Sequence, residues 1–406
     1  MVYALLELTA QGSSEGVGGL PLNICLVLDQ SLSMQGEKME QARDAARYVA
    51  DQLGPRDAIS VVSFNDRATI VVRAQRNAQP REVRSAVEGI IPKGGTELAA
   101  GLKAGLDELR RGVNLTGRAV SSLLVLTDGR TYGDESRCLE LAEHARKLEL
   151  LITPLGVGEE WNEDLLETIA YRCGSHSQYI DRPDAIVRAF REHIESLRNI
   201  CGRQAQVTIR TAADTRLTQA HRVYPLIGRV ELVSSGNVSE QTYLLDNLRL
   251  GETQGLLLEL VLPPVVDGVV DVAGCILEWK PIDSHDSRVQ ARYSMRAEVD
   301  PHATPTGTLD ATVRLAVEKV MAYKLQKRAW QDVAEGNLAA ATSKLRMVVT
   351  RLLEAGEPDL ARTVQSEADN LERNGVMSAT GTKQIKYGTR GLGRTRSMRV
   401  ADQVPS

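Results

Sequence analysis

Between residues 21 and 200, short apolar runs alternate with amphipathic segments. The runs are almost continuously apolar, and the segments that follow them have a 3.6-residue apolar rhythm. Strands with apolar residues on both faces are typical of a parallel sheet covered by helices. The predicted strands are Leu22–Leu28, Ala58–Phe64, Ser121–Thr127 and Leu150–Val157, and the predicted helices are Glu37–Leu53, Thr96–Arg111, Glu135–Leu148 and Asp184–Ile200.

A further strand, Ala68–Val72, follows Phe64 across only three residues. That connection is too short for a crossover helix, so this strand is expected to pair antiparallel at the edge of the sheet. We therefore predict an α/β domain over residues 20–202, with a doubly wound, mostly parallel sheet of about six strands.

The pattern changes to period two after Cys201, and no helix of useful length is indicated up to residue 300. Alternation of this kind, with frequent turn signals, predicts an antiparallel β-sandwich over residues 203–300. Residues 1–19 contain another strand, Val2–Leu8, and a linker rich in Gly and Ser. We expect this strand to join the sandwich, with the α/β domain inserted after it. The predicted sandwich strands are Val207–Arg210, Arg229–Val233, Gln241–Leu245, Leu256–Leu262, Val269–Ile276 and Val289–Ala297.

The last quarter of the chain divides into a helical domain, 301–373, and a basic tail, 374–406. Breaks at Gly336 and Gly356 predict three helices in the domain. The tail has almost no apolar periodicity and is expected to be disordered. It carries six Lys/Arg against one acid, a net +5, which leaves −9 for residues 1–373 of a total of −4. A mildly acidic body argues against a nucleic-acid-binding core.

Oxygen-bearing side chains lie in three loops near the ends of the predicted strands. Asp29, Ser31 and Ser33 come directly after the first strand, Thr96 precedes a helix, and Asp128 follows the strand Ser121–Thr127. In open α/β sheets, ligands bind beyond the carboxyl ends of the strands. Two carboxylates and three hydroxyls are hard ligands, which suit Mg²⁺ or Mn²⁺ better than zinc.

These residues resemble the metal-ion-dependent adhesion site of von Willebrand factor type A (VWA) domains, and the resemblance covers residues 20–200. It implies that Ser31 and Ser33 bind the metal directly, that Thr96 binds it directly or through water, and that Asp29 and Asp128 act mainly through waters. The cation would be Mg²⁺, with Mn²⁺ or Ca²⁺ as substitutes, and its open position would bind an Asp or Glu of a partner protein. Leu32 stands where the family usually has Gly, which bears on the shape of the loop.

The same residues contain no evident catalytic pair, so we expect no enzymatic activity. Metal-dependent phosphohydrolases, the enzyme alternative, carry a second carboxylate two residues after the first, and here that position is Ser31. The five cysteines are scattered without a C-x-x-C pair, which indicates neither a zinc ribbon nor a disulfide framework. His285 lies in an expected sandwich turn and is interpreted as part of a solvated loop.

The basic tail suggests a second role. Thr382, Thr389 and Thr395 each lie near Lys or Arg, and they are candidate phosphorylation sites in a disordered segment. Bacterial proteins that resemble this chain often belong to systems of Ser/Thr kinases, PP2C-type phosphatases and FHA-domain proteins. The resemblance thus implies an adaptor in such signalling. The alternative is a partner of a MoxR-type AAA+ ATPase in the maturation of complexes.

No run of 18 apolar residues is present, and the first eight residues have no basic segment of the kind that begins a signal peptide. We therefore expect a cytoplasmic protein without a membrane span. A cell-surface adhesin or channel-associated protein is the less favoured alternative.

Overall fold

The computed structural model describes residues 1–12, 19–131, 133–237, 239–245, 247–264, 268–282, 284, 287–300, 302 and 310–394. These residues form two compact units. One runs from residue 19 to Asn199, and the other combines the first twelve residues with those from Ile200 onward.

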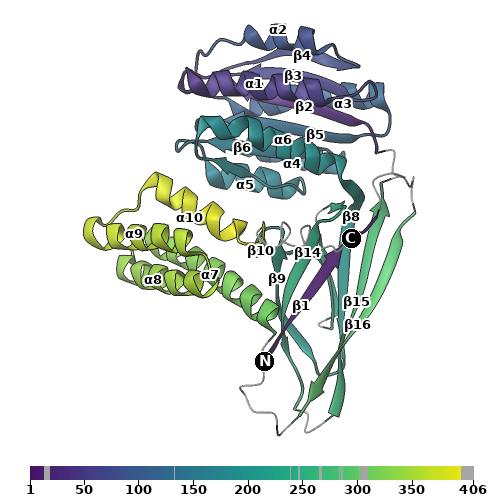
Figure 1. The fold of residues 1–406 in the computed structure, drawn as a ribbon, viewed down its shortest axis with the longest axis vertical. Coiled ribbons are helices and arrows are strands. Elements are labelled where there is room, and N and C mark those ends of the chain that lie inside the picture. The colour runs from purple at the N-terminus through teal and green to yellow at the C-terminus, as the bar shows by residue number, and fades with distance from the viewer. Residues whose placement is uncertain are drawn as a thin grey trace, which may run out of the picture. The chain divides into compact units, whose positions relative to one another are not determined.

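The first unit is built on a six-stranded sheet with the order β4-β3-β2-β5-β6-β7 (Figure 1). Only β4 is antiparallel to its neighbour, and the other five strands are parallel. The predicted α/β sheet is therefore confirmed. Its strands are β2 (Leu22–Asp29), β3 (Ala58–Phe64), β4 (Ala68–Arg76), β5 (Val120–Thr127), β6 (Leu151–Val157) and β7 (Gln178–Ile180).

Helices cover both faces of this sheet. α1 and α6 pack against each other on one face, and α3 packs on β2, β3 and β5 beside α4 on the other. The central strand β2 is buried along its whole length, because both of its faces meet helices. The helices are α1 (Glu37–Gln52), α2 (Pro80–Glu88), α3 (Leu98–Thr116), α4 (Glu135–Lys147), α5 (Glu163–Arg172) and α6 (Ile186–Arg198), and two short 3-10 turns are Leu32–Met34 and Pro183–Ala185.

The second unit contains two antiparallel sheets. One has the order β1-β14-β9-β10, and the other β11-β12-β8-β15-β16 with β13 beside β8. The N-terminal strand β1 pairs with β14 along its full length. The strands are β1 (Val2–Thr9), β8 (Ile200–Thr211), β9 (Arg216–Tyr224), β10 (Gly228–Arg229), β11 (Glu231–Asn237), β12 (Glu240–Leu244), β13 (Leu248–Arg249), β14 (Thr253–Val261), β15 (Gly268–Pro281) and β16 (Val289–Val299).

Side chains from both antiparallel sheets enter one apolar cluster. Leu256 and Leu258 of β14 are buried there with Val207 and Ile209 of β8. The other side of the β14 sheet packs on helices, since Val223 and Leu257 belong to a second cluster with helical residues. The sheet of β1, β9 and β14 is thus covered on both faces, as its alternating apolar positions require.

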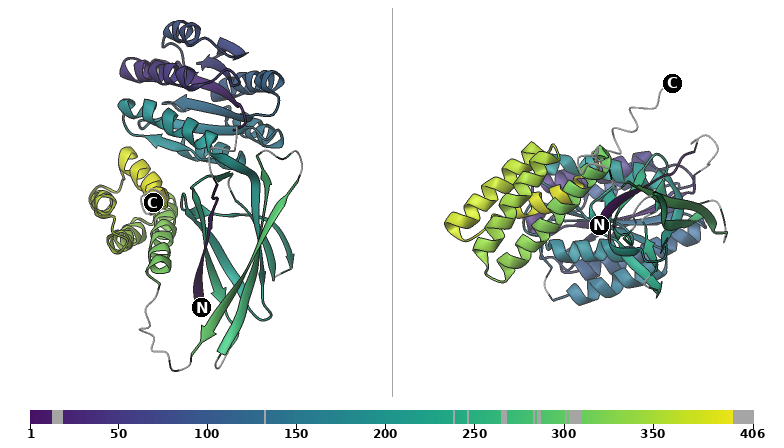
Figure 2. Two further views of the ribbon diagram at one scale, coloured as in Figure 1. Left: turned by 45° about the vertical axis from the view of Figure 1, so that its right-hand side comes forward. Right: turned by 90° about the horizontal axis from the view of Figure 1, so that it is seen from below.

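Four helices make up the C-terminal part, and α7 lies against β1, β9 and β14 (Figure 2). The four helices follow one another and pack as consecutive hairpins, α7 on α8, α8 on α9 and α9 on α10. They are α7 (Ala311–Ala334), α8 (Leu338–Glu354), α9 (Pro358–Asn374) and α10 (Ala379–Gly391).

The predicted disordered tail from residue 374 is wrong over Ala379–Gly391, which form α10. Ser378 caps the helix, and its hydroxyl accepts a hydrogen bond from the Gly381 amide. Ile385 is fully buried in the helical cluster. The end of α10 is held by long-range contacts, because the Ile227 amide donates to the carbonyl of Arg390 and Lys319 donates to that of Leu392. Those partners are over 60 residues away in sequence, so the local composition of the tail could not indicate them.

Among the described residues, every helix is too short or too polar to cross a bilayer. Their cysteines are all free thiols, as expected from their spacing, and four of the five are buried.

Candidate metal centre

Backbone hydrogen bonds hold three loops together at the carboxyl end of the parallel sheet. The loop after β2 receives a bond from the Lys93 amide to the Gln30 carbonyl, 2.6 Å long, and donates one from Leu32 to the Gly94 carbonyl, 3.2 Å long. The Gln30 amide also donates to the carbonyl of Phe64, the last residue of β3. The loop that carries Thr96 therefore lies directly beside the loop that carries the two serines.

Four of the five predicted site residues form one chain of hydrogen bonds. Asp29 accepts a bond from the Ser31 amide at 2.8 Å, and the hydroxyls of Ser31 and Ser33 lie 3.0 Å apart. Ser33 donates to Oδ1 of Asp128 at 2.6 Å. Both carboxylates are buried, whereas Ser33 is exposed. The site thus opens to solvent on its hydroxyl side and is closed on its carboxylate side.

Thr96 and Ser33 both lie next to Gly129. A Cβ atom placed on Gly129 would be 2.9 Å from the Thr96 hydroxyl and 3.7 Å from that of Ser33. The glycine therefore leaves room for two hydroxyls to face the same space, which a larger residue would fill. All five residues that the sequence indicated are gathered here.

Two residues that sequence reasoning missed hold the Thr96 loop. The Thr131 hydroxyl donates to the Thr96 carbonyl at 3.2 Å and accepts from the Leu98 amide at 3.2 Å. Asp134 accepts a bond from the Ala99 amide at 2.7 Å and another from Thr131. The first turn of α3 is thus capped from the loop after β5, and its own N-cap residue makes no side-chain bond.

Asp29 is held from a neighbouring strand. The Thr127 hydroxyl donates to its second oxygen at 2.6 Å. Burial raises the pKa of the Asp29 carboxyl to about 6, and the charge of Asp128 acts in the same direction, while hydrogen bonds from Thr127 and Ser31 oppose the rise. A carboxylate in such surroundings is stabilised by a nearby cation.

The spacing of the donors fits a small divalent ion. Adjacent oxygens of an octahedral Mg²⁺ with bonds of about 2.1 Å lie about 3.0 Å apart, because they subtend a right angle. The hydroxyls of Ser31 and Ser33 have that separation. Every donor is a hard oxygen, and the described part of the chain contains no group of three or more His, Cys, Asp or Glu that could hold a metal ion. The donor set therefore fits a small divalent cation that prefers oxygen ligands.

Lys38, which sequence reasoning also missed, forms an ion pair with the Asp128 carboxylate. Nζ of Lys38, in the first turn of α1, lies 2.5 Å from Oδ2 of Asp128 and 3.3 Å from the Ser33 carbonyl oxygen. In the sequence, only its position five residues after Ser33 could have indicated it.

The candidate phosphorylation sites have different surroundings. Thr382 is half-buried on α10, and its hydroxyl donates to the Ser378 carbonyl. Thr389 is completely buried, and its hydroxyl donates to the Ile385 carbonyl at 2.9 Å. A kinase could reach Thr389 only if α10 first detached from the fold, because no part of its side chain is exposed. Thr395 and His285 lie outside the described residues.

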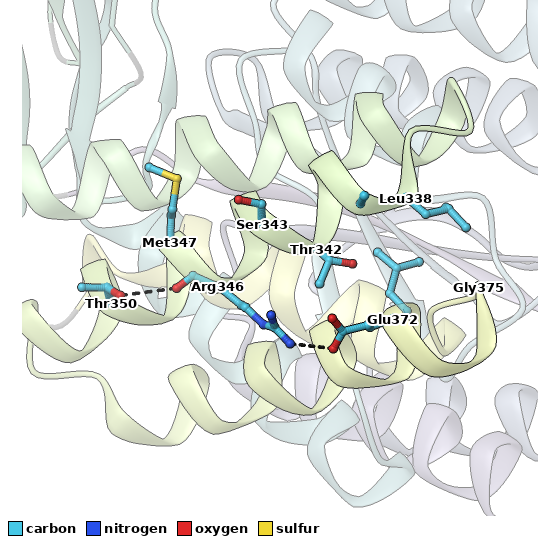
Figure 3. A pocket seen from close by; sticks show the side chains of 10 residues that line it. Leu338, Thr342, Ser343, Arg346, Met347, Thr350, Glu372 and Gly375 are labelled. Atoms are coloured by element: carbon cyan, nitrogen blue, oxygen red, sulfur yellow. Dashed lines mark hydrogen bonds and ion pairs between the residues drawn. The ribbon is translucent and has the colours of Figure 1, made fainter.

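A separate groove of about 580 Å³ runs between α8 and α9 (Figure 3). Leu338 and Met347 line it together with an ion pair in which Arg346 binds Glu372 at 2.6 Å. Its ten lining residues include no histidine or cysteine, and its one carboxylate is already paired. The groove has no donor set comparable to that at the strand ends.

The fold and this set of strand-end residues define a VWA domain, and the model of the von Willebrand factor type A family matches residues 23–191. A solved von Willebrand factor type A protein from Catenulispora acidiphila has the same fold over 96% of this chain and 92% of its own, with a TM-score of 0.75 and 17% identity. VWA domains mediate protein–protein interactions, and their metal-ion-dependent adhesion sites bind divalent metals.

The chain belongs to the Sll0103-like family. It is 30% identical over 353 residues to the uncharacterised protein sll0103 of Synechocystis, a match that covers 86% of this chain and 78% of the relative. The model of the Sll0103-like C-terminal alpha-helical domain matches residues 311–395, which include α10. Inter-alpha-trypsin inhibitor heavy chain H3 of Mesocricetus auratus is 31% identical over 165 residues, but only 19% of that protein is covered.

Proposed function

We propose that this protein is a non-catalytic adaptor that binds an acidic side chain of a partner protein through a divalent cation at the strand-end site. Mg²⁺ is the preferred ion in this proposal, with Mn²⁺ or Ca²⁺ as substitutes. The observation that carries the proposal is the pair of hydroxyls on Ser31 and Ser33, which lie 3.0 Å apart, with the Ser33 hydroxyl donating to the buried Asp128.

Neutral hydroxyls leave a bound cation with most of its charge, so that it supplies a strong local attraction for a carboxylate. The carboxylates of the chain itself are turned inward, where Asp29 is bound by Thr127 and by the Ser31 amide. The exposed side of the site, at Ser33, is therefore the side on which a partner's Asp or Glu would bind. This polarity favours binding of an acidic partner over binding of a basic one.

The absence of catalysis is part of the proposal. A phosphohydrolase that used Asp29 as nucleophile would need an acid near Ser31, and the side chain there is a hydroxyl bonded to Ser33. An assay with p-nitrophenyl phosphate and Mg²⁺ tests this directly. Turnover by the purified protein that disappears in Asp29→Asn would contradict the proposal.

We further propose that the adaptor works in the cytoplasm, in an assembly with Ser/Thr kinases, PP2C-type phosphatases or FHA-domain proteins. A MoxR-type AAA+ ATPase is the alternative partner. The half-buried Thr382 remains a candidate for phosphorylation in the first setting, because its side chain is in part accessible.

Affinity capture with and without EDTA tests the binding mode. The immobilised protein is expected to retain an acidic partner in Mg²⁺ and to release it in EDTA, and Ser33→Ala is expected to retain none. Lys147→Met, a substitution of an exposed lysine in the last turn of α4, is a control that leaves the site unchanged. Equal capture by wild type and Ser33→Ala in Mg²⁺, or undiminished capture by wild type in EDTA, would contradict binding through a metal.

A further inference from the structure

The Lys38 ammonium occupies an unusual place for a cation. Lys38 lies in the first turn of α1, between Glu37 and Glu40. The amino end of a helix carries a partial positive charge, so acids are favoured there and a lysine is not. A specific partner is needed to account for the inward direction of this side chain, and Asp128 supplies it at 2.5 Å.

Both oxygens of Asp128 are engaged. Oδ1 accepts the Ser33 hydroxyl at 2.6 Å, and Oδ2 accepts Lys38 at 2.5 Å. The Asp128 side chain is completely buried, whereas 31% of the lysine side chain is exposed. Removal of one partner from a buried ion pair leaves an uncompensated charge, which is strongly destabilising. Lys38 therefore neutralises Asp128 whenever no other cation is near it.

The ammonium also contacts the proposed site beyond Asp128. It lies 3.3 Å from the carbonyl oxygen of Ser33, and a Cβ atom on Gly158, just after β6, would be 4.0 Å away. It thus contacts the loops after β2 and β5 and lies near the loop after β6. A monovalent positive charge in this place repels a divalent ion held by Ser33 and attracted by Asp128.

We propose that Lys38 is an internal counter-cation that competes with the divalent ion for Asp128 and so lowers the metal affinity of the site. The lysine stabilises the metal-free protein and weakens the metal-bound one. The site would then load only above a threshold of free metal, set by a residue that is not itself a ligand. This inference rests on the proposed function for the presence of the cation, but not for the nature of the partner.

Calorimetric titration of Mg²⁺ into the full chain tests the proposal, with wild type, Lys38→Met and Lys38→Arg in parallel. Removal of the charge in Lys38→Met is expected to tighten Mg²⁺ binding by about tenfold or more, because a unit positive charge at a few ångströms from the ion is lost. Lys38→Arg keeps the charge and is expected to bind about as wild type does. Lys147→Met loses the same charge in the last turn of α4. That turn leads into the amino end of β6, whereas the metal site lies at the carboxyl ends of the strands, so this variant is expected to change nothing.

Thermal unfolding supplies a second measurement. In EDTA, Lys38→Met is expected to unfold at a lower temperature than wild type, and excess Mg²⁺ is expected to raise its midpoint by more than that of wild type. Lys38→Gln, whose amide can still donate to Asp128, replaces Lys38→Met if the latter does not fold.

The outcomes separate this inference from the proposed function. If wild type binds Mg²⁺ and the neutral variants bind it no more tightly, the competition is refuted and the metal site stands. If no variant and no wild-type sample binds Mg²⁺ or Mn²⁺, both the inference and the proposed function are refuted.

Discussion

Ser33 and Asp128 are joined by a hydrogen bond of 2.6 Å from the serine hydroxyl to Oδ1, although 95 residues separate them in the chain. The bond exists because β2 and β5 are parallel neighbours whose carboxyl ends meet at one edge of the sheet. It brings an exposed hydroxyl next to a fully buried carboxylate. This arrangement underlies the proposed function, and the surrounding contacts yield separate tests.

Thr131 is predicted to position Thr96. Thr131→Ala removes the bonds to the Thr96 carbonyl and from the Leu98 amide. We expect a loss of about 1–3 kcal/mol in the free energy of unfolding, since a buried amide loses its acceptor. Metal affinity should fall as well, because the Thr96 loop is no longer fixed. Denaturant unfolding and Mg²⁺ titration measure the two effects.

Thr131→Ser keeps the hydroxyl and is the matched control. Recovery of both stability and Mg²⁺ affinity in this variant is expected. If Thr131→Ser binds Mg²⁺ as weakly as Thr131→Ala, the hydroxyl does not position the site.

Gly112 is predicted to be required for the close packing of α3 on β2. A Cβ atom there would lie 1.9 Å from Oδ1 of Asn23. The Asn23 side chain is buried, and its Nδ2 donates to the Leu109 carbonyl at 2.8 Å. Overpacking of this kind costs about 1–3 kcal/mol, which exceeds the helix-propensity gain of about 1 kcal/mol from Gly to Ala. Denaturant unfolding of Gly112→Ala checks the sign.

Gly391 is the matched control on α10, because a Cβ atom there meets nothing within 4 Å. Gly391→Ala is expected to leave stability unchanged or slightly higher. Equal effects of the two substitutions would show that the close contact at Asn23 is relieved without cost.

His221 is predicted to make the second unit sensitive to acid. Burial lowers the pKa of its imidazole from 6.5 to about 4, with Lys324 and Arg229 acting in the same direction and Glu259 opposing. Above pH 6.5 the ring is neutral in both the folded and the unfolded protein, and its contribution to stability is fully present. As the pH falls from 6.5 toward 4, the unfolded chain binds a proton that the folded one does not, and stability is lost.

At pH 4.5 this difference amounts to about 2–3 kcal/mol. His221→Gln removes the titrating group, so unfolding experiments at pH 7.5 and 4.5 should show a smaller loss in the variant than in wild type. Nδ1 of His221 is buried without a hydrogen-bond partner among the described residues, so the ring gains nothing from protonation there. Identical pH dependence in the two proteins would contradict the assignment.

Thr389 and Thr382 are predicted to respond differently to a negative charge. Thr389→Glu places a carboxylate where no solvent reaches, beside Ile385 in the helical cluster, and should detach or unfold α10. Thr382→Glu, on the half-buried side, should cost about 1 kcal/mol or less. Limited proteolysis of α10 distinguishes the two, and equal protection in both variants would contradict the burial of Thr389.

The central strands could be predicted because burial on both faces requires a nearly continuous run of apolar residues, as in β2 and β3. Short or half-exposed elements have no such run. The three-residue strand β7 and the helix α5 were missed, and so was β9, in which three of the nine residues are polar and exposed. Helix α10 was not predicted because its end is held by residues distant in sequence, such as Lys319 and Ile227.

The candidate site shows the same division. Four of the five proposed ligands could be predicted because each follows a strand and therefore falls at the carboxyl end of the parallel sheet, whereas Thr96 was indicated by its place just before a helix. Thr127, Thr131 and Lys38 could not be predicted, since their roles depend on side-chain contacts between separate loops. A Thr or a Lys at such positions is common in any sequence, and only the folded chain shows which oxygen it binds.

Calorimetric titration of Mg²⁺ and Mn²⁺ into wild type, Asp29→Ala and Ser33→Ala tests the central claim most directly. A saturable heat of binding is expected for the wild-type protein, with none for either variant while both keep the wild-type circular dichroism spectrum. Lys147→Met is expected to bind as wild type does. The absence of heat in the wild type, or an unchanged heat in Asp29→Ala and Ser33→Ala, would contradict a metal site at the carboxyl ends of these strands.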